Sequence, residues 1–211
     1  MTRRTLLSDK SGSGALEFAL VLPVLLILLF AVIDGGRWIW SYNRAAKAAQ
    51  VGARVASVTK IIPTGLIGSY VGASVGGTTL TQGDVIPAAA IGTVTCNAPS
   101  GTLACACTAT VPPTGGSCPG TISTIGWNAI IGRVKQFDPA IKDTNISVEY
   151  RGSGLGYAGD PSGLNTSPLV TVRISNLTFQ PITFLALKSI QAFPVTSSTF
   201  TAEDELGNQS N

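Results

Sequence analysis

The chain has 211 residues, of which 45% are hydrophobic and only 12% are charged, and its formal net charge is +3. This composition is the opposite of that of a disordered chain, and the small net charge does not indicate a surface that binds nucleic acid. The complete absence of histidine excludes Ser-His and Cys-His nucleophile pairs and any zinc site built on imidazole, so we expect no enzymatic activity, cofactor or metal.

The basic residues are concentrated near the N-terminus. Residues 1–60 hold eight of the 14 basic residues but only three of the 11 acidic ones, so a basic, apolar arm precedes a nearly neutral body. Within the arm, residues 15–33 (ALEFALVLPVLLILLFAVI) carry a single charge. As a helix they would be about 28 Å long, close to the hydrocarbon thickness of a bilayer. Because Arg3, Arg4 and Lys10 precede them, the positive-inside rule places the N-terminus in the cytoplasm and the body across the membrane.

Two other interpretations of the apolar run are weaker. A cleavable secretory signal has a shorter apolar region that ends in a small-x-small site, whereas this run ends in AVIDGGRW. A buried core helix conflicts with the length of the run and with its flanks. We therefore predict one transmembrane helix, followed by aromatic residues suited to the membrane interface, Trp38, Trp40 and Tyr42.

Glu17 is the one charged residue of the apolar run. A carboxylate inside a membrane costs a few kcal/mol (~2.5–3.5 on insertion scales), so Glu17 is a functional candidate unless it lies near enough to the surface to be hydrated. The surrounding residues 12–18 (GSGALEF), after a short basic leader, resemble the processing site of type IV pilin-like proteins. The resemblance implies that a prepilin peptidase cleaves between Gly12 and Ser13. The new ammonium of Ser13 would then pair with Glu17 of a neighbouring subunit.

A longer segment, residues 17–57, resembles the N-terminal part of the TadE/TadG-like family, which are minor pilins or pseudopilins of the tight-adherence (Flp, type IVc) pilus system. The matching features are Glu17-Phe18, Pro23, Asp34, Gly36-Arg37 and the stretch from Asn43 to Arg54. The family usually has Glu-Phe-Gly-Arg at the membrane exit, where this chain has Asp-Gly-Gly-Arg.

The resemblance implies a structural, non-catalytic protein that takes part in pilus assembly. It would lie in the bacterial inner membrane as a single-pass protein with a periplasmic C-terminal domain, either staying there or entering the extracellular pilus. The implied partners are other pilin subunits, TadE/TadF-like minor pilins, the prepilin peptidase, the inner-membrane assembly platform and membrane lipid, with no nucleic acid.

The alternative function is a bitopic envelope protein with a tethered periplasmic binding or enzymatic domain. Residues 72–76 (GASVG) do match the G-x-S-x-G pattern of hydrolases, in which the serine is the nucleophile. No histidine exists to activate Ser74, so we interpret the match as chance.

A helical pattern continues beyond the apolar run through residues 42–59. One face is polar, with Asn43, Lys47, Gln50, Arg54 and Ser57. The opposite face is made of small residues that would allow a helix or a sheet to approach closely: Ala45, Ala48, Ala49, Gly52, Val55 and Ala56. If the helix is continuous from Ser13 to Val58, Pro23 and Gly35-Gly36 are its expected bends.

The body is predicted to be α+β, a pilin-like domain with a second helix and a small antiparallel sheet. Apolar residues at helical spacing predict an amphipathic helix over 121–137, ended by Asp138-Pro139. Alternating or β-rich runs predict a hairpin or loops at Gly92–Cys96 and Leu103–Val111, and strands at Ile146–Tyr150, Leu169–Ser175 and Ile190–Thr201.

These patterns divide the chain into six predicted regions. They are a leader (1–12), a transmembrane helix (13–34), a periplasmic extension of that helix (35–60), a Gly/Thr-rich region with the cysteines (61–120), a helix with antiparallel strands (121–202) and a flexible tail (203–211).

All four cysteines lie in the region predicted to be periplasmic, where disulfides are the expected state. A bond between Cys105 and Cys107 would be strained, which favours two bonds from this pair to Cys96 and Cys118 and leaves their connectivity open. The spacing of the four matches no zinc module, so disulfides are favoured over a metal clip.

Overall fold

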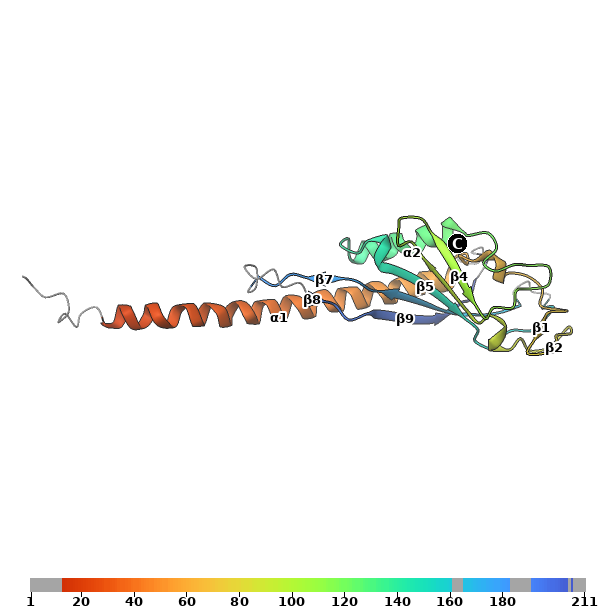
Figure 1. The fold of residues 1–211 in the computed structure, drawn as a ribbon, viewed down its shortest axis with the longest axis horizontal. Helices are drawn as coiled ribbons and strands as arrows, with labels where there is room; N and C mark the ends of the chain where they lie inside the picture. Colours follow the sequence, from red (N-terminus) through yellow and green to blue (C-terminus); the bar gives the residue numbers. More distant parts are fainter. Residues whose placement is uncertain (1–12, 161–164, 183–190, 205, 207–211) are drawn as a thin grey trace, which may run out of the picture. The chain divides into compact units, whose positions relative to one another are not determined.

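The computed structural model describes residues 13–160, 165–182, 191–204 and 206 (Figure 1). The chain forms two compact units, Met1–Ser41 with Thr178–Gln191 and Tyr42–Leu177 with Ala192–Asn211. The fold is α+β, as predicted. In chain order its helices and strands are α1 (Ser13–Val58), β1 (Ser74–Val75), β2 (Thr78–Thr79), β3 (Thr93–Asn97), β4 (Ala104–Thr108), α2 (Thr124–Phe137), β5 (Ile146–Arg151), β6 (Leu169–Ile174), β7 (Thr178–Phe179), β8 (Gln191–Ala192) and β9 (Thr196–Thr201).

Helix α1 confirms the long N-terminal helix expected from the apolar run and the helical pattern after it. It continues without interruption through Pro23 and through Gly35-Gly36, where bends were expected. The proline at position 23 has no N–H to donate to the carbonyl one turn earlier, so the helix lacks one hydrogen bond there.

The end of α1 differs from the prediction at one residue. Ser57 was assigned to the polar face, but it is only 6% exposed. Its carbonyl oxygen accepts hydrogen bonds from the backbone N–H groups of Glu203 (2.7 Å) and Asp204 (3.1 Å). The last carbonyl groups of a helix have no hydrogen-bond donor within the helix. Here Glu203 and Asp204 supply the donors for the carbonyl of Ser57, and Ser57 is buried beside them.

The second unit is built on a five-stranded antiparallel sheet with strand order β4-β3-β5-β6-β9. Buried and less buried residues alternate along β3, β5 and β6, so one face of the sheet forms the core. Its buried side chains are Val94, Cys96, Ile146, Val148, Tyr150, Val170, Val172 and Ile174. The sheet joins strands from two regions that differ in composition, 61–120 and 121–202.

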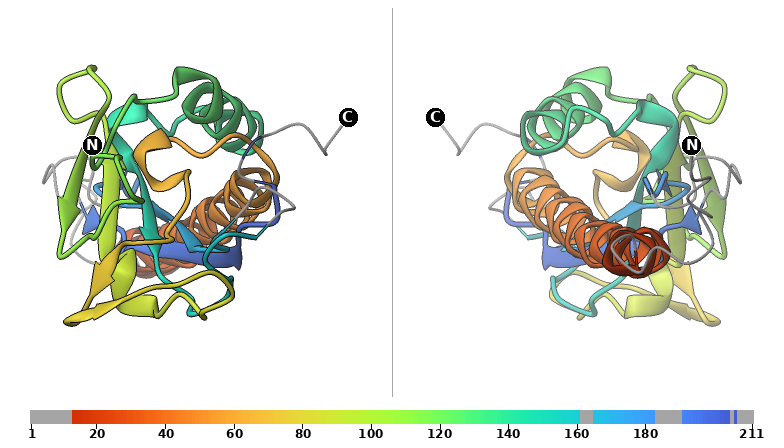
Figure 2. Two further views of the ribbon diagram at one scale, coloured as in Figure 1. Left: turned by 90° about the vertical axis from the view of Figure 1, so that its right-hand side faces the viewer. Right: turned by 90° about the vertical axis from the view of Figure 1, so that its left-hand side faces the viewer.

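Two helical segments cover the core face of this sheet, α2 and residues 42–58 of α1 (Figure 2). Helix α2 contributes Trp127, Ile130, Ile131 and Val134, and α1 contributes Ala48, Ala49, Ala53 and Ala56. The small residues of α1 therefore allow the close approach that was predicted from them, and both α2 and the sheet pack against this part of α1. The helix α2 was expected from residue 121 and starts at Thr124, because the Ser123 side chain accepts the N–H of Gly126 as an N-cap.

The strand predicted over Ile190–Thr201 is wrong as a single element. The described part of it forms two strands in different sheets: β8 pairs with β7, and β9 pairs with β6 at the edge of the five-stranded sheet. Pro194 lies between them, and proline has a fixed φ and no N–H for a sheet ladder. Ile190 lies outside the described residues.

A smaller apolar cluster lies under the loops that precede β3. It contains Tyr70, Ala73, Val75, Leu80, Ile86, Ala90 and Ala158. In one of these loops Asp84 Oδ2 accepts two hydrogen bonds from Thr81, one from its backbone N–H and one from its hydroxyl, each at 2.7 Å. These bonds lower the pKa of the exposed Asp84 carboxyl below its usual value. They order a turn and bring no second charged group to it.

Candidate membrane-anchoring and assembly site

The first half of α1 exposes its apolar side chains. Within the described residues, α1 is the one helix long and apolar enough to cross a membrane, and its most apolar stretch is not buried in the structure. Leu20, Leu28 and Val32, for example, are 69%, 65% and 69% exposed. By contrast, five alanines within residues 42–58 are buried in the body: Ala45, Ala48, Ala49, Ala53 and Ala56. An apolar surface of this extent on a soluble protein marks a membrane or protein contact.

Glu17 and Phe18 lie near the start of this exposed segment. Both side chains are exposed, Phe18 to 64%. Ser13 is the first residue of α1, and a spacing of four residues places its backbone one helical turn from Glu17 on the same face. Gly12, on the other side of the predicted cleavage site, lies outside the described residues, so cleavage between Gly12 and Ser13 stays a prediction.

A second charged group lies at the other end of the apolar run. Asp34 is 6% exposed, and its Oδ1 lies 2.9 Å from Arg37 Nη1. The same oxygen accepts the backbone N–H of Ile182 at 2.9 Å, and the Arg37 guanidinium lies 5.3 Å from the centre of the Phe179 ring. The resemblance drew attention to Asp34 and Arg37, but no pattern in the sequence connected them with residues 179–182.

The second unit holds another ion pair that the sequence did not indicate. Arg44 of α1 reaches the end of α2, where its Nη2 lies 3.1 Å from Asp138 Oδ1 and 3.2 Å from the carbonyl oxygen of Phe137. Asp138 was singled out only because it ends α2. Its carboxylate also serves to join that end to α1.

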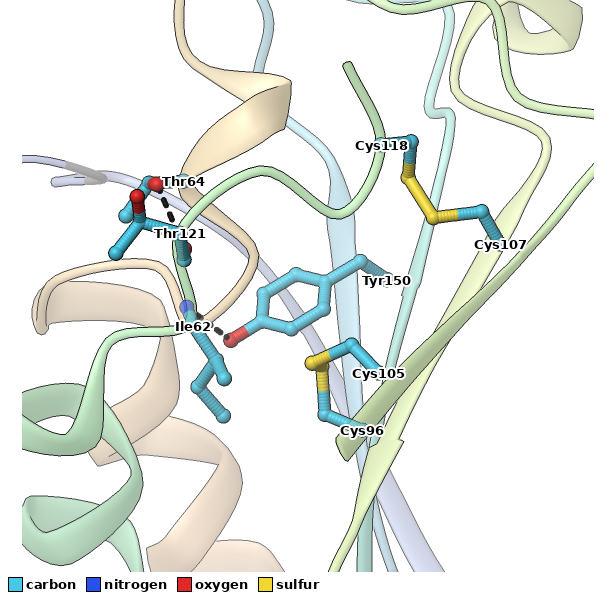
Figure 3. Close-up of a disulfide and its surroundings, with 8 residues drawn as sticks. All are labelled: Ile62, Thr64, Cys96, Cys105, Cys107, Cys118, Thr121 and Tyr150. Atoms are coloured by element: carbon cyan, nitrogen blue, oxygen red, sulfur yellow. Dashed lines mark hydrogen bonds between the residues drawn. A yellow bond between two sulfur atoms is a disulfide. The ribbon is translucent and has the colours of Figure 1, made fainter. Parts of the chain in front are cut away.

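The four cysteines form two disulfides, Cys96–Cys105 and Cys107–Cys118 (Figure 3). The disulfide prediction is confirmed, and the connectivity that the sequence left open is now assigned. No thiolate of these four remains to bind a metal. Cys96 and Cys105 face each other across β3 and β4, while Cys107–Cys118 ties β4 to the segment that leads into α2.

Residues around the disulfides hold neighbouring segments in place (Figure 3). The hydroxyl of Tyr150 accepts the backbone N–H of Ile62 at 3.3 Å, and Thr64 Oγ1 donates to the carbonyl oxygen of Thr121 at 2.7 Å. Tyr150 is 1% exposed and pairs with Val94 across β5 and β3. These contacts tie residues 62–64 to β5 and to the segment that precedes α2.

Ser74 does not lie in a nucleophile elbow. It begins β1, which pairs with β2 as a short antiparallel hairpin through Gly76-Gly77. A nucleophile elbow requires a sharp turn from a strand into a helix. The match to the hydrolase pattern therefore lacks its structural context.

These observations define a class of protein in which one long N-terminal helix is apolar and exposed at its start and completes the core of an α+β domain at its end. That arrangement is compatible with a single-pass membrane protein. Residues 12–54 match the model of the TadE-like protein family, as their resemblance predicted. No curated protein and no solved structure matches the chain.

Proposed function

We propose that this chain is a membrane-anchored minor pilin or pseudopilin of the TadE type, with a structural, non-catalytic role in assembling a tight-adherence type IVc pilus. The observation that carries the proposal is that one segment, residues 12–54, matches the TadE-like family and also contains the whole exposed apolar run. The same segment extends into the part of α1 that packs in the body.

The proposed location is the bacterial inner membrane, with the N-terminus in the cytoplasm and the body in the periplasm. Arg3, Arg4 and Lys10 support this orientation through the positive-inside rule. The two disulfides support it independently, because disulfides persist in the periplasm and are rare in the cytosol.

Glu17 is the proposed contact to other pilin subunits. After removal of the leader, its carboxylate pairs with the N-terminal ammonium of a neighbouring subunit. Each charge alone would be penalised inside a membrane, so each needs an opposite partner. Other proposed partners are TadE/TadF-like minor pilins, the prepilin peptidase and the inner-membrane assembly platform.

Removal of the leader is the first expected result. In cells that contain a prepilin peptidase, mass spectrometry of the purified protein should find Ser13 as its N-terminal residue. Gly12→Glu should leave a longer, unprocessed chain, whereas Thr5→Glu, a matched change elsewhere in the leader, should be processed normally. An intact Met1 in the wild-type protein from such cells would contradict the proposed processing.

Substitution of Glu17 tests the proposed function directly. In Glu17→Ala, crosslinking to the other pilins should fall by about tenfold or more, because the neighbouring ammonium loses its partner within the membrane. Membrane insertion should be unchanged or slightly improved, since the apolar run loses its charge. Both disulfides should still form, because all four cysteines belong to the second compact unit and residue 17 to the first.

The matched control is Glu203→Ala, which removes an exposed carboxylate from the body and should leave crosslinking unchanged. Normal crosslinking and full pilus formation in Glu17→Ala would show that the carboxylate is incidental. That result would favour the alternative, an envelope protein with a tethered binding or enzymatic domain.

A further inference from the structure

One contact in the first unit is not explained by an anchoring helix alone. Asp34 Oδ1 accepts hydrogen bonds from Arg37 of α1 and from the backbone N–H of Ile182, a residue 148 positions away. An Asp-Arg pair three residues apart on a helix is ordinarily exposed and needs no third partner. Asp34 is instead 6% exposed. Burying a carboxylate is costly unless its partners are in place, so Asp34 holds Ile182 against the helix.

Arg37 strengthens the same attachment at a second point. Its guanidinium carbon lies 5.3 Å from the centre of the Phe179 ring, within the range of a cation–π interaction, and Phe179 is 7% exposed. Two residues of α1 thus hold both ends of residues 179–182. We call these residues the docked segment.

The place of the attachment along α1 decides what the docked segment can contact. Asp34 directly follows the apolar run 15–33, so the backbone of Ile182 lies level with the end of that run. The side chain of Ile182 is 45% exposed, and Ile33 and Ile39 of α1 are 43% and 56% exposed. In a membrane-spanning helix this level is the boundary between hydrocarbon and headgroups.

We propose that the docked segment is a second membrane contact of this protein, held by Asp34 and Arg37 so that Ile182 lies in the lipid boundary beside α1. The partner is lipid, because the exposed side chain of Ile182 lies level with the end of the exposed apolar run. In the sequence, the following residues 183–190 (TFLALKSI) are also mainly apolar.

The consequence is a restraint on the anchor. A single helix is free to rotate about its axis in a bilayer, and contacts at the interface set that rotation. Because the docked segment lies on one side of α1, its contact with lipid would fix the rotation of the helix about its axis. The inference rests on the membrane anchoring of the proposed function, but it does not depend on a pilin role.

The test places a fluorescent label that reports polarity on single added cysteines of the full chain, reconstituted in phosphatidylcholine–phosphatidylglycerol vesicles. All four native cysteines are disulfide-bonded, so only the added thiol reacts. Ile182→Cys is compared with Leu25→Cys in the apolar run and with Thr79→Cys, an exposed residue of the body. The label at 182 should emit at shorter wavelength than that at 79 and should be quenched by spin-labelled lipid, as should the label at 25.

Asp34→Ala, combined with Ile182→Cys, tests whether Asp34 holds the docked segment at the lipid boundary. Without the carboxylate, lipid quenching of the label at 182 should fall toward the value at 79, while the label at 25 stays quenched. Asp143→Ala removes an acid from a half-exposed ion pair with Lys135 in the body and should change neither label. Intact disulfides in each variant confirm that the body has folded.

Each other outcome has a defined meaning. A label at 182 that is exposed to water while the label at 25 is in lipid would overturn the second contact and leave the anchor intact. Labels exposed to water at both positions would overturn the membrane anchoring itself. A label at 182 that emits at short wavelength without quenching by lipid would show a protein partner. Unchanged quenching in Asp34→Ala would show that Asp34 does not hold the segment. Either result would overturn the inference.

Discussion

Gly52→Val is expected to lower the free energy of unfolding of the body by about 2 kcal/mol or more, because it overpacks the point where α1 meets both α2 and the sheet. A Cβ atom at position 52 would lie 2.7 Å from Val134 Cγ2 and 3.3 Å from Val172 Cγ1. Both neighbours are valines, whose side chains rotate little, and both are 0% exposed. Either α1 must move away from the sheet or the core must rearrange.

The matched control is Gly132→Ala, because a Cβ at position 132 of α2 would meet no atom within 4 Å. That change should stabilise the body by about 0.5–1 kcal/mol through helix propensity alone. Denaturant unfolding of the full chain in detergent, followed by near-ultraviolet circular dichroism, measures both variants. Equal effects of the two substitutions would contradict the close approach at Gly52.

Removal of the Cys107–Cys118 disulfide is the second large expected effect. The double substitution Cys107→Ser with Cys118→Ser should lower the free energy of unfolding by about 2–4 kcal/mol, as is typical for a disulfide that closes a short loop. This bond ties β4, an edge strand, to the segment that leads into α2. That segment also accepts hydrogen bonds from the backbone N–H groups of Thr64 and Gly65, at the carbonyl oxygens of Thr121 and Pro119.

Hydrogen exchange near Thr64 distinguishes the effect of Cys107–Cys118 from that of Cys96–Cys105. Hydrogen exchange at Thr64 and Gly65 should accelerate when Cys107–Cys118 is removed. The matched control replaces Cys96 and Cys105 by alanine and should leave that exchange slow, because β3 and β4 are still paired from Thr93–Thr108 to Asn97–Ala104. Non-reducing digestion of the wild-type protein should yield both linked peptides, and four free thiols or stoichiometric zinc would contradict the assignment.

The features that depend on neighbours in the sequence were predictable. The apolar run and the helix spacing of α2 are local patterns, because a helix makes its hydrogen bonds between residues four apart and repeats its faces every few residues. The small residues of α1 likewise indicated a close approach before any partner was known. The spacing of the cysteines disfavoured one pairing, since Cys105 and Cys107 are too near each other to bond without strain.

The features that depend on residues far apart were decided by the tertiary structure. Which strand pairs with which depends on burying one face of every strand together, so composition could not show that β3 and β4 join β5 in one sheet. Ser57 is polar and lies on a polar helical face in the sequence, yet the backbone of Glu203 and Asp204 buries it. The sequence places Asp34 in an ordinary exposed ion pair of a helix. In the structure, the backbone N–H of Ile182, 148 residues away in the chain, donates to the Asp34 carboxylate. A hydrogen bond of that separation leaves no periodic pattern, because its two partners are set by the path of the chain and not by the spacing of residues.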